Sequence, residues 1–294
     1  MPDSATRSVS LPAITPFIQM TRHGEGAREP LRRGCVVLSR LDGGRSAIRA
    51  LAPSVKYVLA GEEVYRIDGR SRRVRAGDFL LVEAGTEFEV LTPRPDETIG
   101  LCVYLGVSDG GGGAQPALPL PRVLEGSPID PLAGLLGRYA RLLAARPQAG
   151  AGLARRIVHE ATIGAEDYLT GFSNRLERLG SVKRSTRIET LQRIERARSF
   201  IHAEANRNIS LDEIAGVAAL SRFHLTRSFA EAFGLPPLAY HRRLRLDRAA
   251  ALLKAEADSA TGIAAQLGYA SLSAFTRAFR QHFGVPPTQA RTLA

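Results

Sequence analysis

The chain has 294 residues, of which 44% are hydrophobic and 23% are charged, so it is neither disordered nor fibrous, and its length favours two domains. No apolar run approaches the roughly 18 residues of a membrane span, and the first twenty residues lack the apolar block of a secretory signal. We therefore expect a cytoplasmic protein with no membrane partner. The only cysteines, Cys35 and Cys102, are too few for a disulfide framework or a four-thiolate zinc site.

The net charge of +11 is unevenly distributed along the chain. Residues 1–125 hold 16 basic and 15 acidic side chains, whereas residues 126–294 hold 24 and 14. A basic half beside a neutral half indicates that one part of the protein meets a polyanion, although a solvated basic surface gives the same count.

Short alternating apolar runs fill the first part of the chain. They are separated by turn signals such as Asp68-Gly69 and Gly77-Asp78, which predicts a small antiparallel β-barrel or sandwich. The runs lie at 34–38, 55–59, 63–67, 78–82, 87–91 and 101–105. The glycine- and proline-rich residues 109–121 are typical of a linker.

Helical periodicity follows the linker. Apolar residues recur with helical spacing over 132–143 and 153–161, so two amphipathic helices are expected there. Such a pair either caps the barrel or forms a homodimer contact, and we favour the dimer. Residues 171–186, rich in glycine and serine, are interpreted as a second linker.

An internal repeat dominates the last hundred residues. At an offset of fifty, residues 221–237 and 271–287 are identical at eight of seventeen positions, including Phe229 and Phe279. In each copy a short helix, at about 211–217 and 260–266, precedes a longer helix. Two helices joined by a tight turn form the helix-turn-helix unit, whose second helix enters a DNA major groove.

The ends of the longer helices carry capping signals. Ser221 and Ser271 are expected to cap the N-termini by accepting backbone N–H groups. Gly234 and Gly284 are expected to end the helices in a left-handed conformation, ahead of a proline pair.

Residues on the early exposed face of each longer helix are the candidate base readers, because arginine reaches guanine bidentately and threonine or phenylalanine meets a thymine methyl. They are Arg222, Phe223, Thr226, Arg227, Leu272, Ser273, Thr276 and Arg277. The alternative for Arg227 and Arg277 is a surface salt bridge. Ser221, Ser271 and Arg243 are candidate contacts to the phosphate backbone. His224 and His241 lack partners for a metal site and are expected on the helix surface.

The stretches 220–229, 243–253, 263–279 and 284–287 resemble the DNA-binding domain of the AraC/XylS family of bacterial transcription regulators. The resemblance covers about a third of the chain. It implies two helix-turn-helix units joined by one connecting helix, here about 237–253, that reads two adjacent major grooves of double-stranded DNA. It also implies an activator that contacts RNA polymerase.

Residues 75–88 resemble, more weakly, the second conserved stretch of the cupin-like sensor barrel often found ahead of that domain. The stretch departs from the cupin pattern at the expected histidine, where Glu87 and Phe88 stand. A catalytic metal centre needs several converging histidine or carboxylate ligands, so we expect no metal, no cofactor and no enzymatic activity.

The predicted fold is α+β and multidomain: an antiparallel cupin-like β-barrel at 1–125, a helical dimerisation region at 126–185 and an all-α DNA-binding domain at 186–294. In that domain the first helix-turn-helix spans about 211–233 and the second about 260–283. Tyr57, Tyr65 and Phe88 are candidate residues of a pocket for a small-molecule effector, with a role in the core as the alternative. A cupin-type or DNA-repair enzyme and a non-specific architectural DNA-binding protein remain the other hypotheses.

Overall fold

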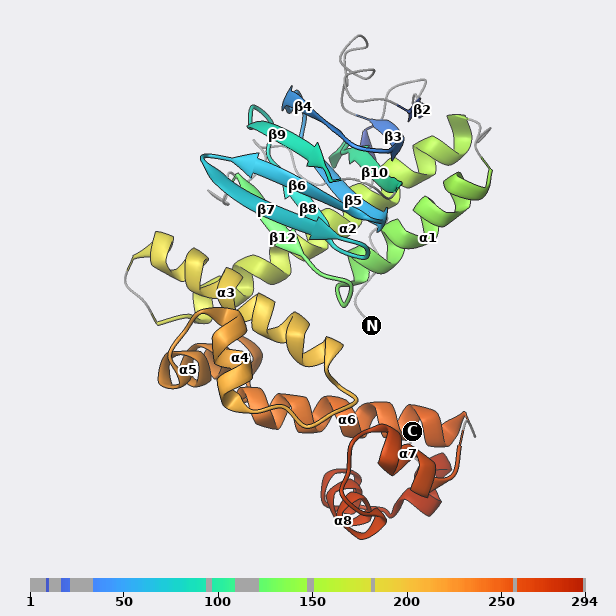
Figure 1. Ribbon diagram of the computed structural model, residues 1–294, viewed down its shortest axis with the longest axis vertical. Coiled ribbons are helices and arrows are strands. Elements are labelled where there is room, and N and C mark those ends of the chain that lie inside the picture. The colour runs from blue at the N-terminus through green and yellow to red at the C-terminus, as the bar shows by residue number, and fades with distance from the viewer. Residues whose placement is uncertain are drawn as a thin grey trace. The chain divides into compact units, whose positions relative to one another are not determined.

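The computed structural model describes residues 9–10, 17–21, 34–93, 97–108, 122–146, 151–180, 183–255 and 258–292. The chain forms two compact units, Met1–Phe172 and Ser173–Ala294 (Figure 1). Each unit is described below by itself. In the described part of the chain, no helix is both long and apolar enough to cross a membrane.

The first unit consists of β-strands followed by two helices. Its strands are β1 (Val9–Ser10), β2 (Phe17–Met20), β3 (Cys35–Leu41), β4 (Gly44–Arg49), β5 (Ser54–Ala60), β6 (Glu62–Ile67), β7 (Arg70–Arg75), β8 (Phe79–Val82), β9 (Glu87–Thr92), β10 (Thr98–Tyr104), β11 (Val107–Ser108) and β12 (Val123–Gly126). One sheet has the order β12-β8-β5-β10-β3-β2 and another the order β4-β9-β6-β7, while β1 pairs with β11. All pairs are antiparallel except β2 with β3.

The two larger sheets enclose an apolar core. Val58 and Leu80 from the six-stranded sheet share one buried cluster with Tyr65, Phe88 and Val90 from the four-stranded sheet. Alternation along β9, where every second residue is buried, turns one face of that strand toward this core. The β-barrel class expected from the sequence is therefore confirmed.

The turn between β6 and β7 forms at Asp68-Gly69, where the sequence predicts it. Asp68 and Gly69 have φ values of 50° and 73°, and they connect two strands whose register pairs Ile67 with Arg70. A two-residue hairpin with positive φ at both positions favours Asp-Gly because few other residues tolerate this conformation.

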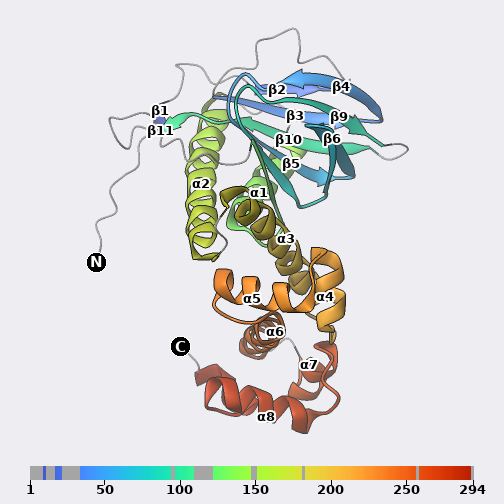
Figure 2. The ribbon, with the colours of Figure 1, turned by 90° about the vertical axis from the view of Figure 1, so that its left-hand side faces the viewer.

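Helices α1 (Pro131–Ala145) and α2 (Ala151–Arg178) follow the strands (Figures 1 and 2). Helix α1 packs on β3, β5 and β10 of the six-stranded sheet, and the ring centre of Tyr168 on α2 lies 5.1 Å from that of Phe79 on β8. Leu136 and Leu143 of α1 are fully buried, as are Ile157 and Ala161 of α2. The apolar faces that suggested a dimer contact are thus already covered within the chain.

The second unit is helical. It contains α3 (Arg184–Ala203), α4 (Leu211–Ala218), α5 (Arg222–Phe233), α6 (Pro237–Lys254), α7 (Ala260–Gln266), α8 (Leu272–Phe283) and a terminal 3-10 helix, Pro287–Thr292. Helix α6 contacts both helix pairs, α4–α5 toward one end and α7–α8 toward the other (Figure 1).

Two expected linkers have different outcomes. Residues 109–121 lie outside the described residues. The linker expected at 171–186 is wrong over most of its length, because α2 continues to Arg178 and α3 begins at Arg184. Tertiary packing accounts for the difference: Phe172 and Leu176 are buried, and Arg175 pairs with Glu195 of α3 at 2.8 Å. The helical segment expected at 126–185 is accordingly divided between the two units.

Candidate nucleic-acid interface

Helix α5 begins and ends where its capping residues stand. The Ser221 hydroxyl accepts the backbone N–H of His224 at 3.3 Å, and Gly234 ends the helix with a φ of 79°. Leu225 and Phe229 are fully buried, so the opposite face of the first turns is open to solvent.

Helix α8 repeats this construction. The Ser271 hydroxyl accepts the N–H of Ala274 at 3.1 Å, and Gly284 ends the helix with a φ of 77°. Phe275 and Phe279 are fully buried in the core of the second helix pair. The repeat in the sequence is thus a repeat of local structure.

The candidate base readers occupy the exposed early faces of α5 and α8. Phe223 is 78% exposed and Leu272 is 43% exposed. Arg222, Arg227, Ser273 and Arg277 are exposed as well, while Thr226 and Thr276 are half-buried. The structure therefore brings together the residues of each predicted set on one face of one helix.

The arginines of the two helices differ in their ion pairs. Arg222 pairs with Asp212 of α4, and the Arg227 Nε donates to Glu231 Oε1 at 2.9 Å one turn later. The hydrogen bond from Arg227 lowers the pKa of Glu231, so this carboxylate is ionised at neutral pH. Arg277 makes no ion pair with any residue that the structure describes.

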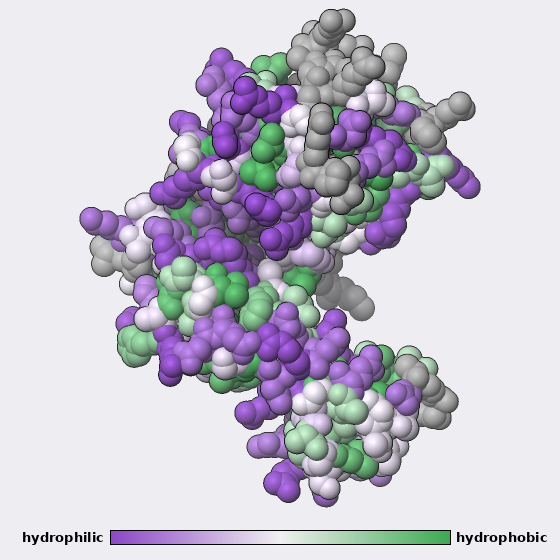
Figure 3. Space-filling model, in the orientation of Figure 1, coloured by the Kyte–Doolittle hydropathy of each residue, from purple (hydrophilic) through white to green (hydrophobic). Residues whose placement is uncertain are grey.

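Helix α6 connects the two helix pairs. Its 18 residues span about 27 Å at 1.5 Å per residue. Arg243 lies on its exposed surface and faces Asp247 at 3.7 Å. Figure 3 shows a largely hydrophilic surface over this helix.

Arg245 is a residue that sequence reasoning missed. It is only 6% exposed, and its guanidinium donates to Asn208 Oδ1 at 2.5 Å and to the backbone carbonyl of Leu267. The same guanidinium lies 4.3 Å from the centre of the Tyr269 ring. Because Asn208 precedes α4 and Leu267 ends α7, this one side chain ties the two helix pairs together. Its position in the middle of an Arg-rich helix gave no signal of burial.

His241 corrects a second expectation. It is 4% exposed rather than on the helix surface, and its Nε2 lies 3.4 Å from the Glu204 carbonyl oxygen. Burial lowers its pKa, and the charge of Arg245 lowers the pKa further. His224, by contrast, is exposed as expected.

The three candidate effector-pocket residues of the first unit do not converge. The Tyr65 and Phe88 rings pack 5.6 Å apart in the core between the sheets. Tyr57 faces helix α1 instead, where a Cβ on Gly137 would lie 2.7 Å from its hydroxyl oxygen. The tight approach of α1 explains why glycine stands at that position.

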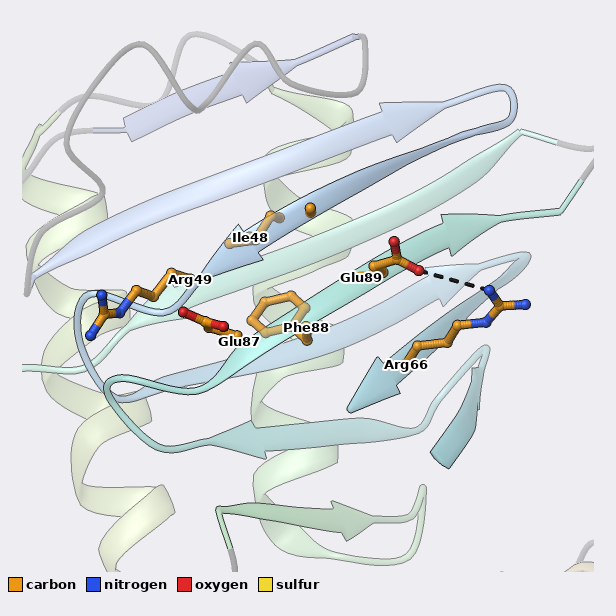
Figure 4. A pocket seen from close by; sticks show the side chains of 7 residues that line it. Ile48, Arg49, Arg66, Glu87, Phe88 and Glu89 are labelled. Carbon is orange, nitrogen blue, oxygen red and sulfur yellow. Dashed lines mark ion pairs between the residues drawn. The ribbon is translucent and has the colours of Figure 1, made fainter. Parts of the chain in front are cut away.

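A shallow depression of about 440 Å³ lies over strands β4, β6 and β9 (Figure 4). Arg66 and Glu89 form an ion pair of 3.8 Å across part of it. Its lining residues are Ala47, Ile48, Arg49, Arg66, Glu87, Phe88 and Glu89. Only Phe88 is shared with the predicted effector pocket. Among the described residues, no three His, Cys, Asp or Glu side chains gather as metal ligands would.

Comparisons with known proteins match the helical unit. A helix-turn-helix domain family model matches residues 214–292. The transcriptional regulator GbdR of Pseudomonas aeruginosa is 34% identical over 93 residues, which is 32% of this chain and 25% of GbdR. The probable transcription factor PqrA of Proteus vulgaris is 35% identical over 88 residues, which is 30% of this chain and 72% of PqrA.

Among solved structures, an AraC-type transcriptional regulator from Chromobacterium violaceum is 32% identical, covers 34% of this chain and 88% of its own, and has a TM-score of 0.32. The chain spans about a quarter of the length of the curated relatives that it matches first. PqrA, by contrast, is covered over 72% of its length by this chain. On this sequence relationship and on the repeated helix-turn-helix structure, the chain belongs to the AraC/XylS family of helix-turn-helix transcription regulators.

Proposed function

We propose that this protein is a sequence-specific transcription activator that binds double-stranded DNA through α5 and α8. The observation that carries the proposal is the pair of equivalent helices with different exposed residues. Arg227 and Arg277 stand at the same sixth helical position, while Arg222 and Phe223 in α5 correspond to Leu272 and Ser273 in α8. Because the two helices place an arginine at the same position but differ in the residues beside it, each helix is suited to a different half-site.

Exposure of apolar side chains supports direct base contact. Phe223 and Leu272 leave their side chains in solvent, and a thymine methyl in the major groove would cover them. Ser221, Ser271 and Arg243 lie at the start of these helices or on α6, where they would contact phosphates and fix the register.

We place the control of this activity in the first unit. A small molecule or a partner protein bound there would change α1 and α2, and through them the dimer geometry or the availability of the second unit. RNA polymerase is the expected partner of an activator. In this proposal the protein has no catalytic role.

Binding-site selection with the full-length protein tests the proposal. Replacing Arg227 by alanine should cost about 1–3 kcal/mol and relax the preference at one or two base pairs. Arg277→Ala should do the same roughly ten base pairs away, one helical turn along the duplex. The two losses should nearly add, since the residues share no partner.

Arg243→Ala is the matched control, because it removes a charge from α6 and no candidate base contact. It should weaken binding to all sequences alike and lower the salt slope by about one unit. If Arg227→Ala and Arg277→Ala also lose affinity evenly, with no change in preferred sequence, the helices anchor phosphates only. A non-specific architectural role would then replace sequence-specific activation.

A further inference from the structure

A lysine and a cysteine face each other inside the strands of the first unit. Lys56 on β5 and Cys102 on β10 are direct partners in the antiparallel register of these strands. The Lys56 Nζ lies 2.8 Å from the Cys102 Sγ, and Lys56 is only 7% exposed. Side chains directly opposite each other on one face of a sheet are held in contact by the backbone, so this approach is built into the register.

Aromatic and acidic side chains surround the lysine of this pair. Its Nζ lies 4.8 Å from the centre of the Tyr104 ring and 5.6 Å from that of Phe88. The buried carboxylate nearby, Glu63, accepts a hydrogen bond from the Tyr65 hydroxyl. A buried ammonium needs compensation, and the aromatic faces, the Cys102 sulfur and the charge of Glu63 provide it.

We propose that Lys56 and Cys102 form an oxidation site, in which peroxide converts Cys102 to a sulfenic acid that Lys56 captures as a sulfenamide. In the first step the thiol reacts with hydrogen peroxide, the sulfur gains one oxygen as S–OH and one water leaves. In the second step the lysine nitrogen attacks that sulfur, an N–S bond replaces the S–O bond and a second water leaves. Together the two side chains lose two hydrogens, and the peroxide is reduced to water.

The lysine acts as an ammonium in the first step and as a neutral amine in the second. Burial lowers the pKa of Lys56, but the attraction of Cys102 and Tyr104 outweighs it, so the pKa lies above its usual value. A cysteine sulfur attacks peroxide as a nucleophile, and the ammonium 2.8 Å away places a positive charge beside that sulfur. Once the sulfur is a neutral sulfenic acid, part of that attraction is gone, and burial then favours release of the proton and a nucleophilic amine.

Cys102 also has the access that the first step needs. It remains partly exposed, whereas Cys35 is 1% exposed. In the β3–β10 register, Cys35 lies opposite Tyr104 and Cys102 lies opposite Val37, so the two cysteines are diagonal neighbours. Diagonal neighbours in a sheet are about 7–8 Å apart, farther than the Cβ atoms of a disulfide. The lysine is therefore the better-placed partner.

Treatment of the full-length protein with hydrogen peroxide, followed by proteolysis and mass spectrometry, tests the site. We expect a cross-linked peptide pair that contains Lys56 and Cys102, lighter than the sum of the two peptides by two hydrogens. Trypsin should no longer cleave after Lys56, and dithiothreitol should restore both peptides.

Variants distinguish capture of Cys102 by Lys56 from a disulfide between Cys102 and Cys35. Cys35→Ser should keep the cross-link, and Cys102→Ser should abolish it. Lys56→Gln should abolish the cross-link and also slow the oxidation of Cys102, because the ammonium beside the sulfur is lost. The sulfenic acid that does form should stay open to dimedone, which should label Cys102 in this variant and not in the cross-linked wild-type protein. A Cys35–Cys102 disulfide in the wild-type protein, or a Cys102 sulfenic acid beside a Lys56 that trypsin still cleaves, would overturn the proposal. The mass of the Lys56 and Cys102 peptides from the oxidised wild-type protein decides between these outcomes. The test therefore holds even where a variant fails to fold.

Discussion

Arg227 and Arg277 occupy the same position in the two repeats, yet their environments differ at the level of single contacts. Arg227 is paired with Glu231, whose other oxygen accepts the Gly180 backbone N–H at 3.3 Å. Arg277 has no ion-pair partner among the described residues. Arg227 must break its hydrogen bond to Glu231 before it can contact a base, and this lowers the free energy gained when α5 binds its half-site. Arg277 of α8 has no such bond to break within the described part of the chain.

Glu231→Gln should therefore strengthen DNA binding through α5. The pair is exposed, with 64% of the Arg227 side chain in solvent, so the gain should be about 0.3–1 kcal/mol. Fluorescence anisotropy with the selected site measures it. The control is the same substitution on an Arg227→Ala background, where most of the gain should vanish. An equal gain in both backgrounds would mean that Glu231 merely repels phosphates.

At the scale of elements, the two helix-turn-helix pairs are held in register by buried contacts to α6. The guanidinium of Arg245 bonds to Asn208 on one side and to the Leu267 carbonyl on the other. Arg248, on the same helix, reaches Asn206 at 3.2 Å from an exposed position. Arg245 thus helps to set the spacing of α5 and α8, in addition to the length of α6.

Arg245→Met should loosen this spacing. The substitution leaves Asn208 and the Leu267 carbonyl without their donor, which costs about 1–3 kcal/mol of folding stability. On DNA, wild-type protein should lose affinity sharply when one base pair is inserted between the half-sites, and Arg245→Met should lose less. Arg248→Met serves as the control and should behave like wild type. An unchanged insertion penalty in Arg245→Met would contradict the assigned role.

His241 gives α6 a pH-dependent contribution to stability. Its pKa is lowered in the folded state by burial, while in the unfolded chain it stays near 6.5. Above about pH 6.5 the imidazole is neutral in both states and contributes no pH dependence. As the pH falls below that value, the unfolded chain binds a proton that the folded state resists, so the free energy of unfolding falls.

Urea unfolding followed by circular dichroism between pH 7 and pH 5 measures this effect. His241→Gln should flatten the decline relative to wild type, because glutamine does not titrate. A decline of equal slope in both proteins would show that other groups dominate acid sensitivity.

At the scale of the whole molecule, self-association remains a prediction. Several of the apolar residues that predicted it, Leu136, Leu143 and Ile157, are buried within the chain. Helices α1 and α2 therefore present a smaller apolar surface to a second copy. Half-buried apolar positions such as Leu135 and Leu142 remain available for a dimer contact over residues 130–170.

We expect the full-length protein to sediment as a dimer and a fragment that starts near Ser185 to sediment as a monomer. The fragment should still bind DNA, more weakly, because it loses the second half-site contact of a dimer and the contacts of Arg175 and Gly180 to α3 and α5. Analytical ultracentrifugation over a range of concentrations decides the question. A monomeric full-length protein at all concentrations would contradict the dimer.

Several features could be predicted from the sequence because they depend on neighbouring residues alone. Asp68-Gly69 specifies its turn by positive φ, Ser221 and Ser271 specify helix starts by accepting free N–H groups, and Gly234 and Gly284 specify helix ends. The four-residue spacing of Leu225 and Phe229, and of Phe275 and Phe279, predicted the buried faces of α5 and α8, and with them the exposed faces.

Other features were decided only by the tertiary structure. Strand β7 has the sequence RSRRVR, which carries no apolar alternation, and it exists because it pairs with β6 across a tight hairpin. Burial of Phe172 and Leu176 keeps α2 helical where glycine and serine predicted a linker. The burial of Arg245 and the contact between Lys56 and Cys102 arise from residues far apart in the chain. Local signals specify turns, caps and faces, whereas strand register and helix packing decide which distant side chains meet.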